Sequence, residues 1–164
     1  MKTRAFIFAR GGSKGIKDKN IISFDGKPLI FQSIKIAKQL KNIEKIYVST
    51  DSKKIYQVAL RYGVSLIKRP AKLATDHSPE WLSWQHAIKY SIENDGDFER
   101  FISLPTTSPL RSIKDVKKCL DSLKSGVDTV ITASKSNRNP WFNMIKLNKN
   151  GDAKLLIKDK IFNN

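Results

Sequence analysis

A glycine-rich, basic segment near the amino terminus is the part of this chain best suited to chemistry. Residues 9–20 (ARGGSKGIKDKN) follow an apolar run at residues 5–8, which predicts a strand that empties into a loop. Glycine lets a backbone approach an anion closely and direct N–H groups toward it, and basic side chains add charge that phosphate oxygens accept. The cations here are Arg10, Lys14, Lys17 and Lys19. The loop therefore predicts a polyphosphate site and a nucleotide enzyme.

Two common phosphate-binding loops do not fit this segment. A P-loop needs Lys and then Ser or Thr after its second glycine, whereas Lys14 is followed by Gly15 and Ile16. A dinucleotide-binding loop needs the spacing G-x-G-x-x-G, which Gly11, Gly12 and Gly15 do not have. A solvated basic turn, whose glycines serve only the turn, is the alternative that the loop alone leaves open.

Three further segments, together with this loop, carry a resemblance to a known family. They are residues 49–51 (STD), residues 69–74 (RPAKLA) followed by Asp76, and residues 107–111 (TSPLR). The loop and these segments resemble, in the same order, the motifs of the CMP-sialic acid synthetase (acylneuraminate cytidylyltransferase) family. The resemblance runs from about Thr3 to about Leu147, which is nearly the whole chain.

The resemblance implies a nucleotidyl transfer. A hydroxyl of a nonulosonic, sialic-acid-like sugar acid would attack the α-phosphorus of CTP, with release of pyrophosphate, for surface glycan synthesis. Charge in the transition state must then be spread over cations and N–H donors, so positioning and charge neutralisation carry most of the catalysis. Arg10 and Lys19 would hold the triphosphate as the catalytic residues.

The other site residues also follow from the resemblance. The expected nucleotide-binding residues are Ala9, Arg10, Gly11, Gly12, Ser13, Lys14, Lys19, Asn20, Arg69, Asp76 and Ser78. The expected sugar-binding residues are Thr106, Thr107, Ser108 and Arg111. Sialate-activating relatives typically have glutamine at the position of Pro105 and often lysine at that of Phe142. A related nonulosonate or a 3-deoxy-octulosonate-like sugar acid is therefore as well supported as ordinary sialic acid.

The family's domain continues beyond the resemblance into further strands, a dimerising excursion and an aspartate-rich motif that binds Mg²⁺. None of these follows Leu147, and Asp152 and Asp159 are more simply explained as solvated surface charges. The resemblance thus implies Mg²⁺ as cofactor, but no metal ligand is assigned in this chain. A homodimer stays open, because relatives pair through the segment not found here. We expect either a fragment of a longer protein or a short form, which could bind nucleotide without turnover.

These residues need a frame, and the sequence alternates between strand-like and helix-like periods. Predicted strands cover residues 5–9, 46–49, 64–67, 101–104 and 128–133, and predicted helices cover about 28–40, 52–62, 79–94 and 112–124. Such alternation favours a three-layer αβα sandwich with a mainly parallel sheet, which the resemblance identifies as nucleotide-diphospho-sugar transferase-like (Rossmann-like). Because ligands of such sheets bind at the carboxyl ends of the strands, the polar segments should meet in one cleft.

Five residues have plainer explanations than chemistry. Asp51 is expected to cap the following helix through the N–H groups of Lys53 or Lys54. His77 is expected to be a polar loop residue rather than a general base. Cys119 is the single cysteine and is expected in the core, without a disulfide. Trp81 and Trp84 have helical spacing, which is typical of core or interface positions.

Composition bounds the class of protein. The 164 residues, with 40% hydrophobic and 28% charged content, fit a single domain over residues 1–164. No apolar stretch is long enough to span a bilayer and no signal peptide is recognisable, which predicts a cytoplasmic protein without a membrane partner. A net charge of +16 could indicate nucleic-acid binding, but the lysines are dispersed and aromatic residues are not interleaved with them. An anionic substrate such as CTP explains the same charge, so no nucleic-acid partner is expected.

Overall fold

The computed structural model describes residues 1–138, 140 and 144–157. The chain divides into two compact units, Met1–Ser122 and Leu123–Asn164. All the motifs discussed above lie in the first unit. The expected single domain over residues 1–164 stays a prediction.

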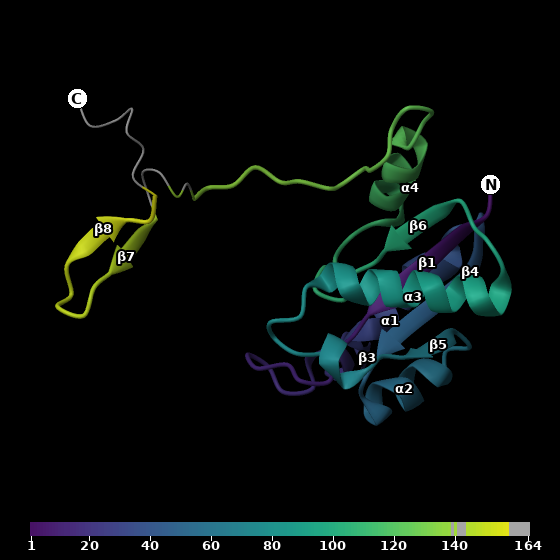
Figure 1. The fold of residues 1–164 in the computed structure, drawn as a ribbon, viewed down its shortest axis with the longest axis horizontal. Helices are drawn as coiled ribbons and strands as arrows, with labels where there is room; N and C mark the ends of the chain where they lie inside the picture. Colours follow the sequence, from purple (N-terminus) through teal and green to yellow (C-terminus); the bar gives the residue numbers. More distant parts are fainter. Residues whose placement is uncertain (139, 141–143, 158–164) are drawn as a thin grey trace. The chain divides into compact units, whose positions relative to one another are not determined.

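A parallel four-stranded sheet forms the centre of the first unit (Figure 1). Its strands are β1 (Thr3–Phe8), β4 (Ile43–Thr50), β5 (Ser65–Lys68) and β6 (Arg100–Ser103), in the spatial order β5-β4-β1-β6. All three pairings between neighbours are parallel. The order reverses at β1, because β4 and β5 extend the sheet to one side and β6 to the other. The crevice outside the carboxyl ends of the strands at such a reversal is where ligands of open α/β sheets bind.

Four helices connect or follow these strands: α1 (Leu29–Gln39), α2 (Lys53–Leu60), α3 (Glu80–Asp95) and α4 (Ile113–Ser122). Pro28 and Pro79 precede α1 and α3, where a fixed φ angle and a missing N–H cost nothing. Ser52 caps α2 with its side chain. At α4, Ser112 and Asp115 cap each other's backbone N–H groups, at 3.2 and 2.9 Å. The helix boundaries expected from the sequence are confirmed to within two residues.

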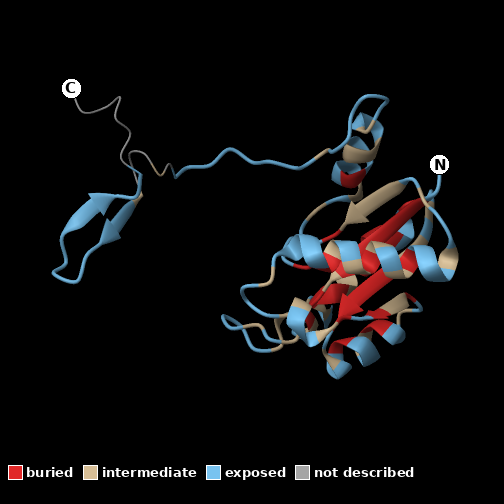
Figure 2. Ribbon diagram, viewed as in Figure 1, coloured by how far each residue is buried: buried red, intermediate tan, exposed pale blue. Residues whose placement is uncertain are grey.

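The helices cover both faces of the sheet, in which β1 is buried along nearly its whole length and β4 over its second half (Figure 2). Side chains alternate between faces along a strand. On one face, Ala5 and Ile7 of β1 belong to a core cluster that includes residues of α1, α2 and α4. On the other face, Phe6 clusters with Tyr47 and with Ala87 of α3. This arrangement confirms the predicted three-layer αβα sandwich with a parallel sheet.

Short elements shape the long loop between β1 and α1. A 3-10 helix, η1 (Lys19–Ile21), is followed by the strands β2 (Ser23–Phe24) and β3 (Lys27–Pro28), which pair as a hairpin. Asp25 and Gly26 at its turn both have positive φ, of 52° and 69°, as a two-residue hairpin turn with right-handed strand twist requires. A second 3-10 helix, η2 (Ala71–Leu73), lies between β5 and α3.

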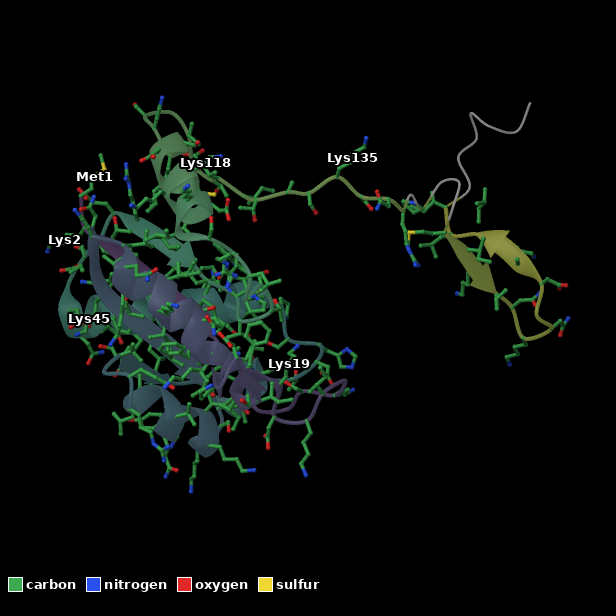
Figure 3. All side chains as sticks on the ribbon, turned by 180° about the vertical axis from the view of Figure 1, so that it is seen from behind. Met1, Lys2, Lys19, Lys45, Lys118 and Lys135 are labelled. Carbon is green, nitrogen blue, oxygen red and sulfur yellow. The ribbon has the colours of Figure 1, made fainter. Side chains whose placement is uncertain are left out.

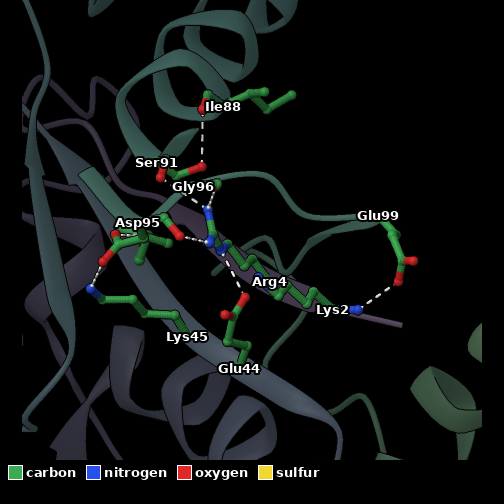
Figure 4. A network of polar contacts seen from close by, with 10 residues as sticks. Lys2, Arg4, Glu44, Lys45, Ile88, Ser91, Asp95, Gly96 and Glu99 are labelled. Atoms are coloured by element: carbon green, nitrogen blue, oxygen red, sulfur yellow. Dashed lines mark hydrogen bonds and ion pairs between the residues drawn. The ribbon is translucent and has the colours of Figure 1, made fainter. Parts of the chain in front are cut away.

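A buried arginine, Arg4, lies at the end of the sheet where the strands begin (Figure 4). Arg4 is fully buried, and its guanidinium donates to the carbonyl oxygens of Ser91, Asp95 and Gly96 at 2.9, 2.6 and 2.8 Å. These carbonyls lie at the end of α3 and in the residue after it, and those of Asp95 and Gly96 have no acceptor role within the helix. Arg4 Nε also donates to Glu44 at 3.1 Å. The arginine thus ties the end of α3 to β1 and β4.

The second unit contains one hairpin, formed by β7 (Ile145–Leu147) and β8 (Ala153–Leu155). The strand expected at residues 128–133 is wrong, because these residues belong to no strand and all are exposed except the half-buried Val130. Their β-branched side chains suit a pleated surface, but such propensity needs a partner strand, and no described strand pairs with them. Phe142 and Asp159, considered above for sugar specificity and metal binding, lie outside the described residues.

Candidate active site

The predicted site residues come together where the strands of the first unit end. Backbone hydrogen bonds continue the strand pairing beyond β1 and β4: Ala9 N–H donates to Ser49 O at 3.0 Å, and Arg69 N–H donates to Thr50 O at 2.8 Å. On the other side of β1, Leu104 N–H donates to Phe6 O at 2.9 Å. The loops that start at Ala9, Thr50, Arg69 and Leu104 therefore leave one edge of the sheet, as the sequence predicts.

Gly11 is the point at which the glycine-rich loop touches its neighbour. Its N–H donates to Asp51 Oδ1 at 2.9 Å. A Cβ atom added to Gly11 would lie 2.9 Å from Cβ of Ser52, closer than such atoms approach in real proteins. The cap expected from Asp51 is therefore wrong: Ser52 Oγ accepts from Ile55 N–H at 3.4 Å, while the Asp51 carboxylate faces the loop. The Asp51 carboxylate binds the Gly11 N–H, which is distant in sequence, rather than the nearby N–H groups of Lys53 or Lys54.

Two of the four basic side chains of this loop contact one carboxylate. Asp76 lies 2.6 Å from Arg10 through one oxygen and 2.6 Å from Lys14 through the other. Hydrogen bonds from Lys14 and then Arg10 hold the pKa of Asp76 below its usual value. Lys19 is half-buried beside the same loop, whereas Lys2 and Lys45 lie toward the other end of the sheet (Figure 3). An anion that enters this loop would compete with the Asp76 carboxylate for Arg10 and Lys14.

Arg69 is a buried cation at the edge of the sheet. Its side chain is 6% exposed, and it donates to Ser49 twice, from Nε to Oγ at 3.1 Å and from Nη2 to the carbonyl oxygen at 2.7 Å. The guanidinium carbon lies 5.5 Å from the centroid of the Phe8 ring, a cation–π contact. Burial lowers the pKa of Arg69, and the carboxylates of Asp51 and Glu80 oppose that shift. Arg69 thus ties the ends of β5, β4 and β1 together.

The predicted sugar-binding turn follows β6. Pro105 O accepts hydrogen bonds from Ser33 Oγ of α1 at 3.2 Å and from Arg111 Nη2 at 2.6 Å. Burial lowers the pKa of Arg111, whose other terminal nitrogen is buried and has no hydrogen-bond partner among the described residues. Thr107 and Ser108 are exposed. Their hydroxyls are more accessible to a substrate than the buried groups around them.

Thr106 and Asn20 link this turn to the glycine-rich loop. Thr106 Oγ1 donates to Asn20 Oδ1 at 2.5 Å, and Asn20 Nδ2 donates to Arg10 O at 2.9 Å. Both side chains are buried. Sequence reasoning placed each of them near a ligand but did not foresee that they contact each other, because 86 residues separate them.

Three further polar atoms on the α3 side of this edge are buried without a hydrogen-bond partner in the described part of the chain. They are Ser78 Oγ, Trp84 Nε1 and His86 Nδ1. The Trp84 ring packs against Phe8 and Phe101, at 6.5 and 5.4 Å between centroids. The sequence predicts Ser78 as a site residue and Trp84 as a core or interface residue, whereas it gives no sign of a role for His86. Only the helical position of Trp84, three residues after Trp81, hinted at burial beside the site.

The residues with plainer explanations lie in several environments. Cys119 is a free cysteine on α4 and is half-buried, so the expected core position is met only in part. Trp81 is 57% exposed, and His77 lies exposed in its loop. No helix among the described residues is long and apolar enough to cross a membrane.

The Mg²⁺ that the resemblance implies stays a prediction. Within residues 1–138, 140 and 144–157, no three His, Cys, Asp or Glu side chains gather in a way that could hold a metal ion. Asp51 and Asp76 are engaged with Gly11 and with the basic loop. Asp152 accepts from Asn148 of its own hairpin turn at 2.8 Å, which agrees with its expected role as a surface charge.

The chain is similar in sequence to known bacterial proteins. The chain is 39% identical over 144 residues to the post-translational flagellin modification protein B of Campylobacter coli, covering 86% of this chain and 61% of that protein. It is 39% identical over 147 residues to the CMP-N,N'-diacetyllegionaminic acid synthase of Campylobacter jejuni, covering 88% of this chain and 63% of that one. The chain thus spans somewhat less than two thirds of the length of these relatives.

Solved structures agree on the fold. A CMP:2-keto-3-deoxy-manno-octonic acid synthetase in complex with CTP superposes with a TM-score of 0.61 at 23% identity, over 75% of this chain and 47% of that one. The sequence model of the family described as Cytidylyltransferase matches residues 5–156, which include every strand and helix of the sandwich except the first two residues of β1. On this match, the chain belongs to the cytidylyltransferase family.

Proposed function

We propose that this chain is the nucleotide-binding part of an enzyme that transfers CMP from CTP to a nonulosonic sugar acid and releases pyrophosphate. The observation that carries the proposal is the position of the glycine-rich loop. Its cations Arg10, Lys14 and Lys19 follow β1 at the point where the strand order reverses. A triphosphate bound there would replace the Asp76 carboxylate as the partner of Arg10 and Lys14.

The roles of the residues follow from charge. Attack on the α-phosphorus shifts negative charge onto the departing pyrophosphate, and fixed cations stabilise that charge because they need no reorganisation as the bond breaks. Arg10 and Lys19 would supply the positive charge that stabilises the departing pyrophosphate, with Lys14 beside them. Thr107 and Ser108, exposed at the carboxyl end of β6, would orient the sugar acid. Ser78 Oγ, just before α3, is a buried polar atom without a hydrogen-bond partner among the described residues, and a nucleotide could satisfy it.

The sugar-acid class rests on a relative. The Campylobacter jejuni protein compared above is named as a synthase of a CMP-linked legionaminic acid. This name supports a sugar acid as the acceptor without fixing which one. Mg²⁺ enters the proposal only as a condition of the assay, because the described residues offer no carboxylate cluster for it.

Titration calorimetry with CTP, ATP and GTP, with and without Mg²⁺, tests the proposal directly. We expect selective CTP binding that Arg10→Gln and Lys19→Gln each weaken about tenfold, the size of one lost charge-assisted hydrogen bond. Lys38→Gln is the matched control, since it removes the same charge from an exposed position on α1. Absent CTP binding, or equal weakening by the control, would contradict a specific nucleotide loop.

Pyrophosphate release with a panel of sugar acids then separates turnover from binding. The panel should include N-acetylneuraminic acid, a legionaminic acid, a pseudaminic acid and a 3-deoxy-octulosonic acid. Release with one of them identifies the acceptor. Selective CTP binding without release from any of them would mark a nucleotide-binding form without turnover.

A further inference from the structure

We infer that Thr106 and Asn20 are positioning residues that couple the sugar-side turn to the nucleotide loop, and that Thr106 acts on CTP binding without touching CTP. The inference rests on the proposed function and deepens it. Resemblance to relatives assigned Thr106 to the sugar and Asn20 to the nucleotide. The hydrogen bonds of the two side chains point to a different use.

Both polar ends of the Asn20 amide are engaged inside the protein. Its nitrogen faces the carbonyl oxygen of Arg10 at 2.9 Å, and its oxygen faces Thr106 Oγ1 at 2.5 Å. A carbonyl accepts but never donates, so the nitrogen must be the end that faces Arg10. The oxygen is then left to accept from Thr106, whose hydroxyl has one proton to give. That proton is no longer available to a sugar hydroxyl or carboxylate.

Burial makes this pair of contacts consequential. Thr106 is 4% exposed and Asn20 is 5% exposed, so neither can exchange its partner for bulk water. A buried polar group that loses its partner keeps its full desolvation cost. The relay, which consists of the hydrogen bonds from Thr106 to Asn20 and from Asn20 to Arg10 O, is therefore favoured whenever the loop and the turn adopt these positions.

The relay acts on one peptide group. The carbonyl of Arg10 and the N–H of Gly11 belong to the same peptide unit. Asn20 holds its oxygen at 2.9 Å, and the Asp51 carboxylate holds its N–H at 2.9 Å. A peptide group is planar, so fixing both ends fixes the plane. That plane sets the direction in which the chain leaves Arg10 and thus where the first cation of the loop stands.

The coupling crosses the crevice at the reversal of strand order. Asn20 lies in η1, at the end of the loop after β1, and Thr106 lies in the turn after β6. These are the two neighbouring strands between which the order changes direction. A change at the sugar side therefore reaches the nucleotide side through two hydrogen bonds, without any contact between the two substrates.

Calorimetric titration of CTP, with no sugar acid present, tests this inference on the full chain. Thr106→Val and Asn20→Ala are each expected to weaken CTP binding about tenfold, because each leaves a buried partner unsatisfied. Thr106→Ser keeps the hydroxyl and should stay within about threefold of the unchanged protein. The double variant should bind CTP no more weakly than Asn20→Ala alone, because the effect of Thr106 passes through Asn20. Asn42→Ala, at an exposed position before β4, is the control.

A second readout needs no ligand and separates the relay from general instability. Amide hydrogen exchange at Gly11, measured under conditions where each variant remains folded, should be faster in Thr106→Val than in Thr106→Ser. Thr106→Ala replaces the valine variant if the latter does not fold. Unchanged exchange at Gly11 in a folded variant would overturn the inference.

The outcomes also distinguish this inference from the proposed function. If the unchanged protein binds no CTP, the proposed function fails. If it binds CTP and Thr106→Val binds equally well while its KM for the sugar acid rises, Thr106 contacts the sugar and the relay is overturned. If only Asn20→Ala loses affinity, Asn20 contacts the nucleotide directly, which overturns it as well.

Discussion

His86 shows how a single residue near the site carries information about its surroundings. It lies on α3, half-buried, and its Nδ1 atom is buried without a hydrogen-bond partner in the described part of the chain. Burial first, and then the charge of Arg69, hold its pKa below the usual value, while Glu93 opposes the shift. The same buried guanidinium that ties three strand ends together therefore disfavours a second positive charge on the helix beside it.

This shift predicts how stability responds to acid. An unfolded chain binds a proton at His86 near pH 6.5, whereas the folded chain binds it only at lower pH, so the unfolded state takes up more protons as the pH falls below about 6.5. The free energy of unfolding should therefore decrease between about pH 7 and 5. Urea denaturation at several pH values measures it. His86→Gln should flatten this decrease and the exposed His77→Gln should not; equal slopes in both variants would contradict the assignment.

At the scale of elements, the sequence predicts the frame better than the contacts between its parts. Periodicity located four strands and four helices of the first unit, because each must bury a regular apolar face. It failed at residues 128–133, where β propensity has no partner strand to act on. It also failed at Asp51, since only the folded sheet brings the Gly11 N–H within reach of that carboxylate. The buried pair of Asn20 and Thr106 escaped prediction for the same reason.

The start of α4 is one element that local sequence does determine. Ser112 Oγ accepts from Asp115 N–H at 3.2 Å, and the Asp115 carboxylate accepts from Ser112 N–H at 2.9 Å. Ser112→Ala removes the first of these and should lower the free energy of unfolding by about 1 kcal/mol, measured by urea denaturation. Ser125→Ala, exposed beyond the end of the helix, should leave it unchanged. A loss shared by both variants would show that the cap contributes nothing of its own.

At the scale of the whole first unit, the two ends of the sheet have different tasks. The carboxyl ends of the strands present loops, charges and unsatisfied polar atoms, which suits a site. The opposite end is closed by Arg4, whose guanidinium meets three carbonyl oxygens at the end of α3 and the Glu44 carboxylate. Asp95, in the same turn, is also bound by Lys45 and Tyr47. Because α3 runs from the site to this end, its anchoring also steadies Trp84 and His86.

Removing the Arg4 guanidinium should therefore destabilise the entire unit rather than one local contact. Arg4→Met keeps much of the apolar stem but strips the last turn of α3 of its donors in a buried setting, which is expected to cost about 3 kcal/mol or more. Arg61→Met, exposed after α2, is the charge-matched control and should cost little. Urea denaturation followed by tryptophan fluorescence measures this loss of stability, since Trp84 belongs to α3 and packs against Phe8 and Phe101. If Arg4→Met unfolds at the same urea concentration as the control, the carbonyl contacts at this end are dispensable, and the packing of Phe6 and Tyr47 against α3 suffices to hold the helix.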